Sequence, residues 1–148
     1  PAIAALNPGI ALPNLAIVLD HIGTPEDRGD EARAEWAGSI GELAKRPNVC
    51  IKLGGLGMDC DNGIGHAYRN APSEALAGEW RPYIETCVEA FGPSRCMFES
   101  NFPVDKGSCS YTVLWNAFKR VVGGVSVAER AALFHDTAAR VYRVTQEI

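Results

Sequence analysis

Three short apolar runs, separated by segments with helical spacing, constrain the fold of this chain more than any other feature of its sequence. The runs are residues 14–20, 49–53 and 95–100. The first is continuously apolar from Leu15 to Leu19, as expected of a strand buried on both faces. Each gap between the runs is longer than the dozen or so residues that a helical crossover needs. The pattern therefore predicts a parallel sheet in an α/β fold.

Apolar residues recur at helical spacing between and after these runs. The predicted helices are 26–45, 73–91, 111–122, a short one opening at Ser126 and a last one opening at Thr137. Ser73 is the expected N-cap of the second helix, and Gly92 followed by Pro93 is expected to end it. Ser126 and Glu129 match a capping box. The predicted order of elements is β-α-β-loop-α-β-α-α-α.

The length of the chain fits a single domain over residues 1–148. Three strands are too few to close a barrel, which needs eight, so the sheet is either a small open one or the end of something larger. The sequence begins with Pro1 rather than Met, which favours a piece of a longer protein.

Composition and charge narrow the classes of partner. The formal net charge of −4, without a block of like charges, argues against a nucleic-acid partner. No apolar run reaches the roughly 18 residues of a membrane span, and the first residues lack the layout of a signal peptide. Five cysteines at irregular spacing, without a C-x-x-C pair, are typical of reduced thiols. We therefore expect a cytoplasmic protein that binds a small molecule, not nucleic acid or a membrane.

Polar residues directly follow the first and third apolar runs. His21 comes after Asp20 at the end of the first run, and Glu99 and Asn101 close the third. Because α/β folds place their chemistry at the carboxyl ends of strands, we expect these side chains to meet there. His21 is either a functional group, able to bind a metal, orient a substrate oxygen or move a proton, or a hydrogen-bonded capping residue.

Glu99 and Asn101 are two positions apart, so strand alternation places both side chains on one side of the sheet. A buried carboxylate needs a partner, and Lys52 in the second run is the expected one. The pair of Lys52 and Glu99 is either structural or brings a carboxylate to the chemistry. Asn101 cannot take that role, because an amide is not a base.

Residues 54–72 form a long polar loop with five glycines and no periodicity. Loops of this length in a compact domain tend to be lids or binding loops. The loop leaves the carboxyl end of a strand, so His66 and Arg69 are either solvated or in contact with a substrate, and Arg69 could clamp a carboxylate with two parallel hydrogen bonds.

Four stretches carry a resemblance to a known family: 17–25, which contains His21, then 48–55, 95–103 and 138–142. Together they resemble the carboxyl-terminal half of the amidohydrolase-related family. This branch of the metal-dependent hydrolase superfamily includes sugar lactonases, a pyrone-dicarboxylate lactonase and some decarboxylases. The third stretch reads Ser-Asn-Phe-Pro where the family usually shows Ser-Asp-Trp-Pro.

The resemblance implies an α/β fold in which this chain forms the C-terminal part of a (β/α)8 TIM-type barrel, with about three strand–helix units plus C-terminal helices. It also implies that His21 is an active-site histidine and a candidate ligand of a divalent metal, Zn or Mn. Asn101 stands where the family has an aspartate that ligates metal or activates water, and this departure counts against a metal. The family's His-x-His on the first strand is absent from this sequence, so we do not expect the chain to assemble the whole site alone.

These features predict a hydrolase of the amidohydrolase-related type that opens a lactone or another cyclic ester of a small carboxylated substrate. Water, activated by a metal or a carboxylate, would attack the carbonyl carbon. The residues expected to act are His21, Asn101 and Glu99 in catalysis and His66, Arg69 and Lys52 in substrate contact.

Two alternatives stay open. The first is a non-oxidative decarboxylase on the same fold. The second is a truncated, non-catalytic half barrel that needs a partner chain, such as a second copy in a homo-oligomer. Its signature would be an exposed apolar sheet edge beside residues 15–19.

Overall fold

The computed structural model describes residues 14–25, 29–58 and 70–144. Its elements in chain order are β1 (Ile17–Leu19), η1 (His21–Gly23), α2 (Asp30–Ala44), β2 (Val49–Leu53), α3 (Ser73–Phe91), η3 (Pro93–Arg95), β3 (Cys96–Phe98), η4 (Val104–Gly107), α4 (Tyr111–Val121), α5 (Val127–Ala131), the π-helical turn η5 (Ala132–Asp136) and α6 (Thr137–Tyr142).

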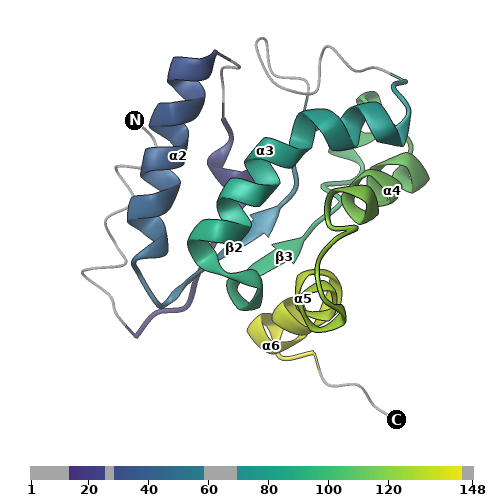
Figure 1. Cartoon of the computed structure of the whole chain (residues 1–148). Helices are drawn as coiled ribbons and strands as arrows, with labels where there is room; N and C mark the ends of the chain where they lie inside the picture. Colours follow the sequence, from purple (N-terminus) through teal and green to yellow (C-terminus); the bar gives the residue numbers. More distant parts are fainter. Residues whose placement is uncertain (1–13, 26–28, 59–69, 145–148) are drawn as a thin grey trace.

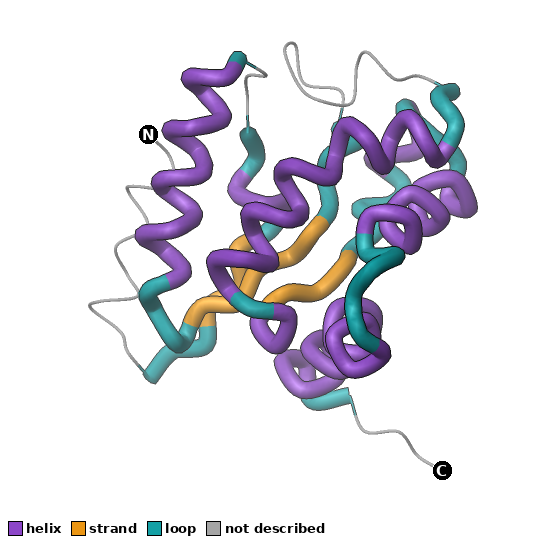
Figure 2. Tube along the Cα trace, viewed as in Figure 1, coloured by secondary structure: helices purple, strands orange, loops and turns teal. Residues whose placement is uncertain are grey.

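The three strands form one parallel sheet in the order β1-β2-β3 (Figure 2). Leu19 of β1 pairs with Ile51 of β2, and Ile51 in turn pairs with Cys96 of β3. Since the strands are parallel, their carboxyl ends lie at one edge of the sheet. The predicted parallel α/β sheet is confirmed, and the residues that follow the strands emerge beside one another.

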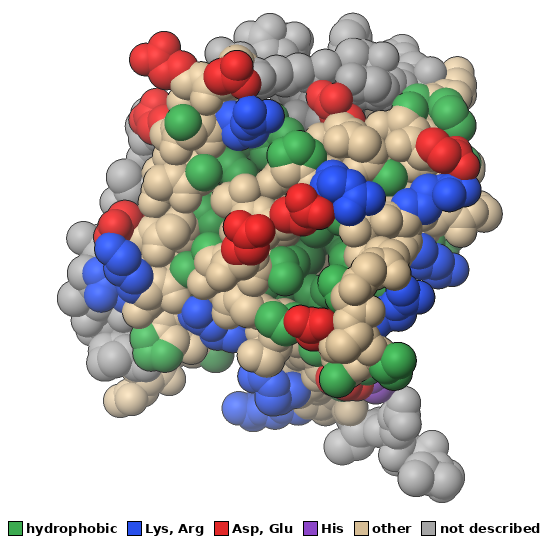
Figure 3. Space-filling view, viewed as in Figure 1, with side chains coloured by type: hydrophobic (Ala, Val, Ile, Leu, Met, Phe, Trp, Pro, Cys, Tyr) green, Lys and Arg blue, Asp and Glu red, His purple; other side chains and the backbone are tan. Residues whose placement is uncertain are grey.

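Helices α2 and α3 cover one face of the sheet (Figure 1). The face beneath them is built from alternate residues of β2, Val49, Ile51 and Leu53, which are completely buried. Trp36 of α2 and Tyr83 of α3 pack with their ring centroids 5.2 Å apart. Figure 3 shows apolar side chains between these helices and charged side chains along their outer surfaces. The residues of β2 that alternate with these three therefore point to the opposite face of the sheet, where they are half-buried.

Aromatic side chains join β3 to α4 and to the C-terminal helices. The ring of Phe98 lies 4.5 Å from that of Phe118 in α4 and 4.7 Å from that of Phe134 in the π-helical turn. Trp115 lies 5.7 Å from Phe118 and 5.9 Å from Phe134. Each such pair adds about 0.5–1.5 kcal/mol beyond the burial of its area. This cluster fixes the C-terminal part of the chain against the last strand.

The ends of the helices test the sequence predictions in detail. Helix α3 begins at Ser73 with Pro72 in the N-cap position, so the prediction that Ser73 is the N-cap is wrong. The hydroxyl of Ser73 instead accepts a 3.0 Å hydrogen bond from Nε of Arg120. The capping box of Ser126 and Glu129 is confirmed. In the part of the chain that the structure describes, no helix has both the length and the apolar character that crossing a bilayer requires.

Arg95 ties the amino end of the sheet to the ends of two helices. It donates to the carbonyl oxygens of Ala44 at 2.9 Å, Arg46 at 2.8 Å and Phe91 at 3.0 Å. These carbonyls lie at the C-terminal ends of α2 and α3, where backbone acceptors have no partner inside the helix. One guanidinium therefore closes both helix ends over the start of β3.

We expect Arg95→Ala to lower the free energy of unfolding by about 2–4 kcal/mol, because it leaves several carbonyls without their charged donor. Urea denaturation measures the change. Arg33→Ala is the matched control, since Arg33 makes an exposed ion pair with Asp30, and its loss should cost less than about 0.5 kcal/mol. Equal losses for the two variants would contradict the role given to Arg95.

Candidate active site

His21 lies in a left-handed turn directly after β1. The φ angles of His21, Ile22, Gly23 and Thr24 are 53°, 49°, 73° and 50°. Such backbone costs a non-glycine residue on the order of 1–2 kcal/mol, so packing must hold the turn. Ile22 is completely buried, and its carbonyl accepts a 2.8 Å hydrogen bond from Nε1 of Trp36. The buried anchor fixes the direction in which the His21 side chain leaves the strand.

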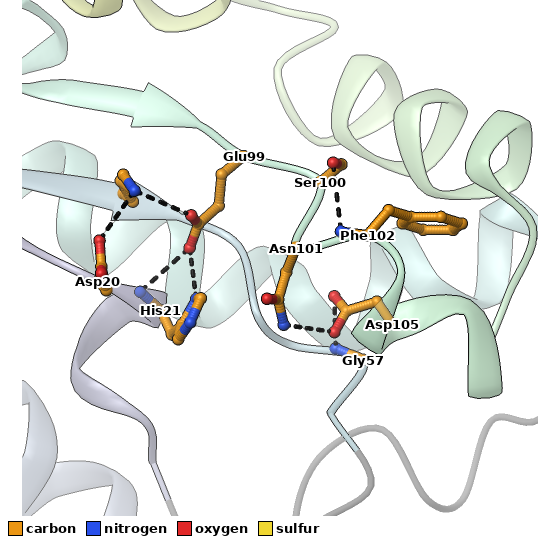
Figure 4. A network of polar contacts seen from close by, with 9 residues as sticks. Asp20, His21, Gly57, Glu99, Ser100, Asn101, Phe102 and Asp105 are labelled. Carbon is orange, nitrogen blue, oxygen red and sulfur yellow. Dashed lines mark hydrogen bonds and ion pairs between the residues drawn. The ribbon is translucent and has the colours of Figure 1, made fainter. Parts of the chain in front are cut away.

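Glu99 follows β3, and its carboxylate contacts His21, which follows β1 (Figure 4). Its Oε1 accepts the backbone N–H of His21 at 3.2 Å and lies 2.5 Å from ring atom Nδ1. A carboxylate is only an acceptor, so Nδ1 carries the proton in this contact. The neutral imidazole then keeps a lone pair on Nε2, which is free to accept a proton or bind a cation.

Lys52 connects the two acidic side chains of the site. Its Nζ lies 3.0 Å from Oδ1 of Asp20 and 3.5 Å from Oε2 of Glu99, so the contact expected between Lys52 and Glu99 is present. Burial alone would lower the pKa of Lys52, but hydrogen bonds to Asp20 and Tyr142 and the charge of Glu99 outweigh it and raise the pKa above its ordinary value. Lys52 is therefore a fixed cation between Asp20 and Glu99.

Asn101 contacts a carboxylate that the sequence reading does not single out. Strand β3 ends at Phe98, and Asn101 has a φ of 50°, so strand alternation does not set its direction. Its Nδ2 donates a 2.8 Å hydrogen bond to Oδ1 of Asp105, whose Oδ2 accepts from the backbone N–H of Gly57 at 3.3 Å. Asp105 is only 1% exposed. The only signal in the sequence was its place four residues after Asn101.

Glycines after β2 let the three strand ends approach one another. A Cβ at Gly55, whose φ is +70°, would lie 2.6 Å from Cβ of His21, and one at Gly57 would lie 3.0 Å from Cγ of Asp105. A Cβ at Gly54 would collide with Glu99. These distances are shorter than a van der Waals contact, so the start of the polar loop is packed between its neighbours and only glycine fits there.

The structure brings together four of the six predicted site residues. His21, Glu99 and Lys52 are in direct contact, and Figure 4 shows Asn101 beside them on the same side of the sheet edge. His66 and Arg69 lie outside the described residues.

The described residues do not form a metal site by themselves. Among them, no group of three His, Cys, Asp or Glu side chains is placed to hold a metal ion. Nε2 of His21 and an amide oxygen of Asn101 are the donors that these two residues can offer, and an amide is a weaker ligand than a carboxylate. A metal at this site would need ligands beyond these residues.

Burial raises the pKa of Asp105 from 3.8 to about 6, against the effect of its hydrogen bonds from Asn101 and Gly57. Between about pH 3.8 and pH 6, the folded chain therefore holds a proton on Asp105 that the unfolded chain has released. The resulting stabilisation is full below pH 3.8 and is lost as the pH rises through about 6.

We expect the wild type to lose about 1–3 kcal/mol of unfolding free energy, relative to Asp105→Asn, as the pH rises from about 4 to about 7.5. Urea denaturation across this range measures the difference, and the asparagine variant supplies a reference without the titrating group. A difference that does not change with pH would contradict the raised pKa.

Gly55→Ala should destabilise the fold by roughly 2–4 kcal/mol and displace His21, because the new methyl group combines a positive φ with a collision. Gly78→Ala is the matched control. Gly78 lies in α3 with nothing within 4 Å of the added Cβ. The free energy of unfolding of that variant should rise by about 0.5–1 kcal/mol, because alanine favours a helix more than glycine does. Thermal unfolding compares the two, and a tolerated Gly55→Ala would refute the close approach.

Comparisons with known proteins give the family of the chain. The family model described as amidohydrolase matches residues 10–144. An uncharacterized protein of Sinorhizobium fredii, y4mH, is 46% identical over 132 residues, which are 89% of this chain and 40% of that protein. An L-fucono-1,5-lactonase of Burkholderia multivorans is 35% identical over 88% of this chain and 44% of its own length.

The fold comparison gives the same result. A crystal structure of an amidohydrolase from Burkholderia multivorans with bound zinc superposes with a TM-score of 0.80 and 33% identity. The match covers 93% of this chain and 47% of that one, so the chain spans less than half the length of the relatives described. Because the structural neighbours are TIM barrels, the three-stranded sheet corresponds to part of such a barrel. The chain therefore belongs to the amidohydrolase family and forms a partial (β/α)8 barrel of that family.

Proposed function

We propose that this chain carries part of the active site of a hydrolase that opens a lactone or another cyclic ester of a small carboxylated substrate. The observation that carries the proposal is the fixed orientation of His21. Glu99 holds Nδ1 at 2.5 Å, and this leaves Nε2 as a base at the carboxyl ends of the strands. The name of the Burkholderia multivorans relative, L-fucono-1,5-lactonase, supports a lactone as the substrate class.

The reaction needs a base that later acts as an acid. Nε2 of His21 would take a proton from water while the water oxygen bonds to the lactone carbonyl carbon. The tetrahedral intermediate would then break its bond to the ring oxygen, and His21 would return the proton to that oxygen. The product is a hydroxy acid. The carboxylate of Glu99, 15% exposed, would stabilise the imidazolium formed between the two steps.

The remaining site residues have supporting roles in the proposal. Asn101 would hold the water or a substrate oxygen beside His21. Lys52 would hold Glu99 in place and, near the substrate, attract the substrate carboxylate. His66 and Arg69 would contact the substrate from the loop after β2. A crystal structure of an amidohydrolase from Burkholderia multivorans holds zinc. Donors beyond the described residues would be needed to hold a metal in this protein.

The rest of the site would come from further barrel strands. Among the described strands, β1 and β3 each have one edge without a strand partner, and Leu15 beside β1 is 52% exposed. We propose that additional strands of the barrel cover these edges, supplied by the same polypeptide or by a second copy. A small-molecule substrate would bind at the carboxyl ends of the strands of that completed barrel.

We expect His21→Gln to lower kcat for hydrolysis of L-fucono-1,5-lactone by about 10²–10⁴-fold, because the amide cannot take a proton from water. KM should change little if His21 acts mainly in the chemical step. Proton release by the full-length protein measures the rate, with and without added Zn²⁺ or Mn²⁺. A panel of other sugar and dicarboxylate lactones covers the substrate class.

His135→Gln is the control for loss of a histidine, since His135 is exposed on the π-helical turn and pairs with its neighbour Asp136. Its rate should equal that of the wild type. An unchanged kcat in His21→Gln would refute the proposed base. Release of CO2 from carboxylated compounds, without lactone hydrolysis, would indicate the decarboxylase instead.

A further inference from the structure

We propose that Asp105 is a positioning residue, which fixes the side-chain amide of Asn101 so that its carbonyl oxygen faces His21. Asn101 and Asp105 then act as one unit. The proposal deepens the proposed function, because it assigns position 101 the chemistry of a hydrogen-bond acceptor for water or a substrate hydroxyl.

Asp105 is joined to Asn101 at two levels. Oδ1 of Asp105 accepts the side-chain hydrogen bond from Nδ2 of Asn101 at 2.8 Å, and the backbone N–H of Asp105 donates to the carbonyl oxygen of Asn101 at 3.2 Å. The short turn η4 also brings the backbone N–H groups of Ser108 and Cys109 onto the carbonyl of Asp105, at 3.0 and 3.2 Å. The turn therefore holds residues 101 and 105 in one fixed relation.

The carboxylate decides which end of the amide points into the site. An asparagine side chain has a donor end and an acceptor end, whereas an ionised carboxylate only accepts. Asp105 must therefore face Nδ2, and Oδ1 of Asn101 points the other way. Figure 4 shows this oxygen on the side of His21. An amide without such a neighbour could present either end to the substrate.

Asp105 is itself prevented from turning away. Its second oxygen accepts the backbone N–H of Gly57 at 3.3 Å, and its side chain lies against Gly57 so closely that a Cβ there would come within 3.0 Å. Among the described residues, no Lys, Arg or His side chain forms an ion pair with Asp105. Burying a carboxylate costs folding free energy, and the hydrogen bonds from Asn101 and Gly57 offset that cost only in part. A role in ordering the site is a physical reason for the chain to carry it.

The identities of residues 101 and 105 are coupled by this contact. A carboxylate at 101 would stand about 3 Å from that of Asp105, and two such groups cannot both stay ionised at that distance. One amide and one carboxylate satisfy each other. The asparagine at 101 is therefore the partner that a carboxylate at 105 requires.

A double-mutant cycle tests whether Asp105 acts through Asn101. We expect Asp105→Asn, which keeps the shape of the side chain, to lower kcat/KM for the lactone by about 10–100-fold in the full-length protein. In the background of Asn101→Ala, the same change should lower kcat/KM by less than about threefold, because the group being positioned is already gone. A role in general stability would lower the rate equally in both backgrounds, and that result would overturn the proposal.

A second readout needs no turnover. In nitrogen-edited NMR of the whole protein, the side-chain NH2 of Asn101 should show one strongly shifted, slowly exchanging proton in the wild type. Asp105→Asn should lose both features. Glu129→Gln, which removes a carboxylate from the capping box of α5 far along the chain, should keep them. If no lactone is turned over, the proposed function fails, and an unchanged Asn101 amide in Asp105→Asn would separately overturn the positioning role.

Discussion

One carboxylate joins the three strands at the edge where their polar residues gather. Glu99 follows β3, its Oε1 binds His21 after β1, and its Oε2 lies beside Lys52 in β2. A half-buried carboxylate needs donors and a counter-charge, so each of these side chains depends on the other two. The glycine-rich exit of β2 is what allows the contact, because side chains at those positions would hold the strand ends apart.

The two ends of the sheet are built on opposite principles. At the amino end, Arg95 supplies donors to helix carbonyls. At the carboxyl end, His21 and Asn101 both have left-handed backbone, which costs free energy at each residue. Two of the strained residues therefore lie at the candidate site, and the aromatic and aliphatic packing beneath the helices supplies the stability that supports them. Barrel enzymes divide stability and chemistry between their two faces in the same way.

Local sequence signals predicted much of this structure. Helix α3 and strand β2 have the predicted bounds, because Pro72 and Gly92 delimit the helix and alternation marks the strand. The ends of β1 and β3 were placed too far out, since ladder pairing depends on neighbours that a sequence does not show. The pairing of Lys52 with Glu99 could be predicted from the sequence, because a buried carboxylate needs a partner of opposite charge.

The contact of Asn101 with Asp105 could not be predicted in the same way. It needs left-handed backbone at 101 and a 3-10 turn at 104–107, and neither conformation has a periodic pattern in the sequence. The N-cap of α3 was misplaced by one residue for a related reason. Serine is a common N-cap, so Ser73 was assigned that position. Pro72 occupies it instead with extended backbone, and a proline side chain has no capping group that would mark it in the sequence.

The left-handed turn after β1 also affects which residue types fit at position 21. Among residues other than glycine, asparagine, aspartate and histidine adopt a φ near +50° at the lowest cost, although the β-branched Ile22 and Thr24 of the same turn also adopt it. The turn therefore favours short polar residues or glycine at position 21. A substitution that exchanges the imidazole for such a residue would keep the backbone of the turn and remove the ring that contacts Glu99.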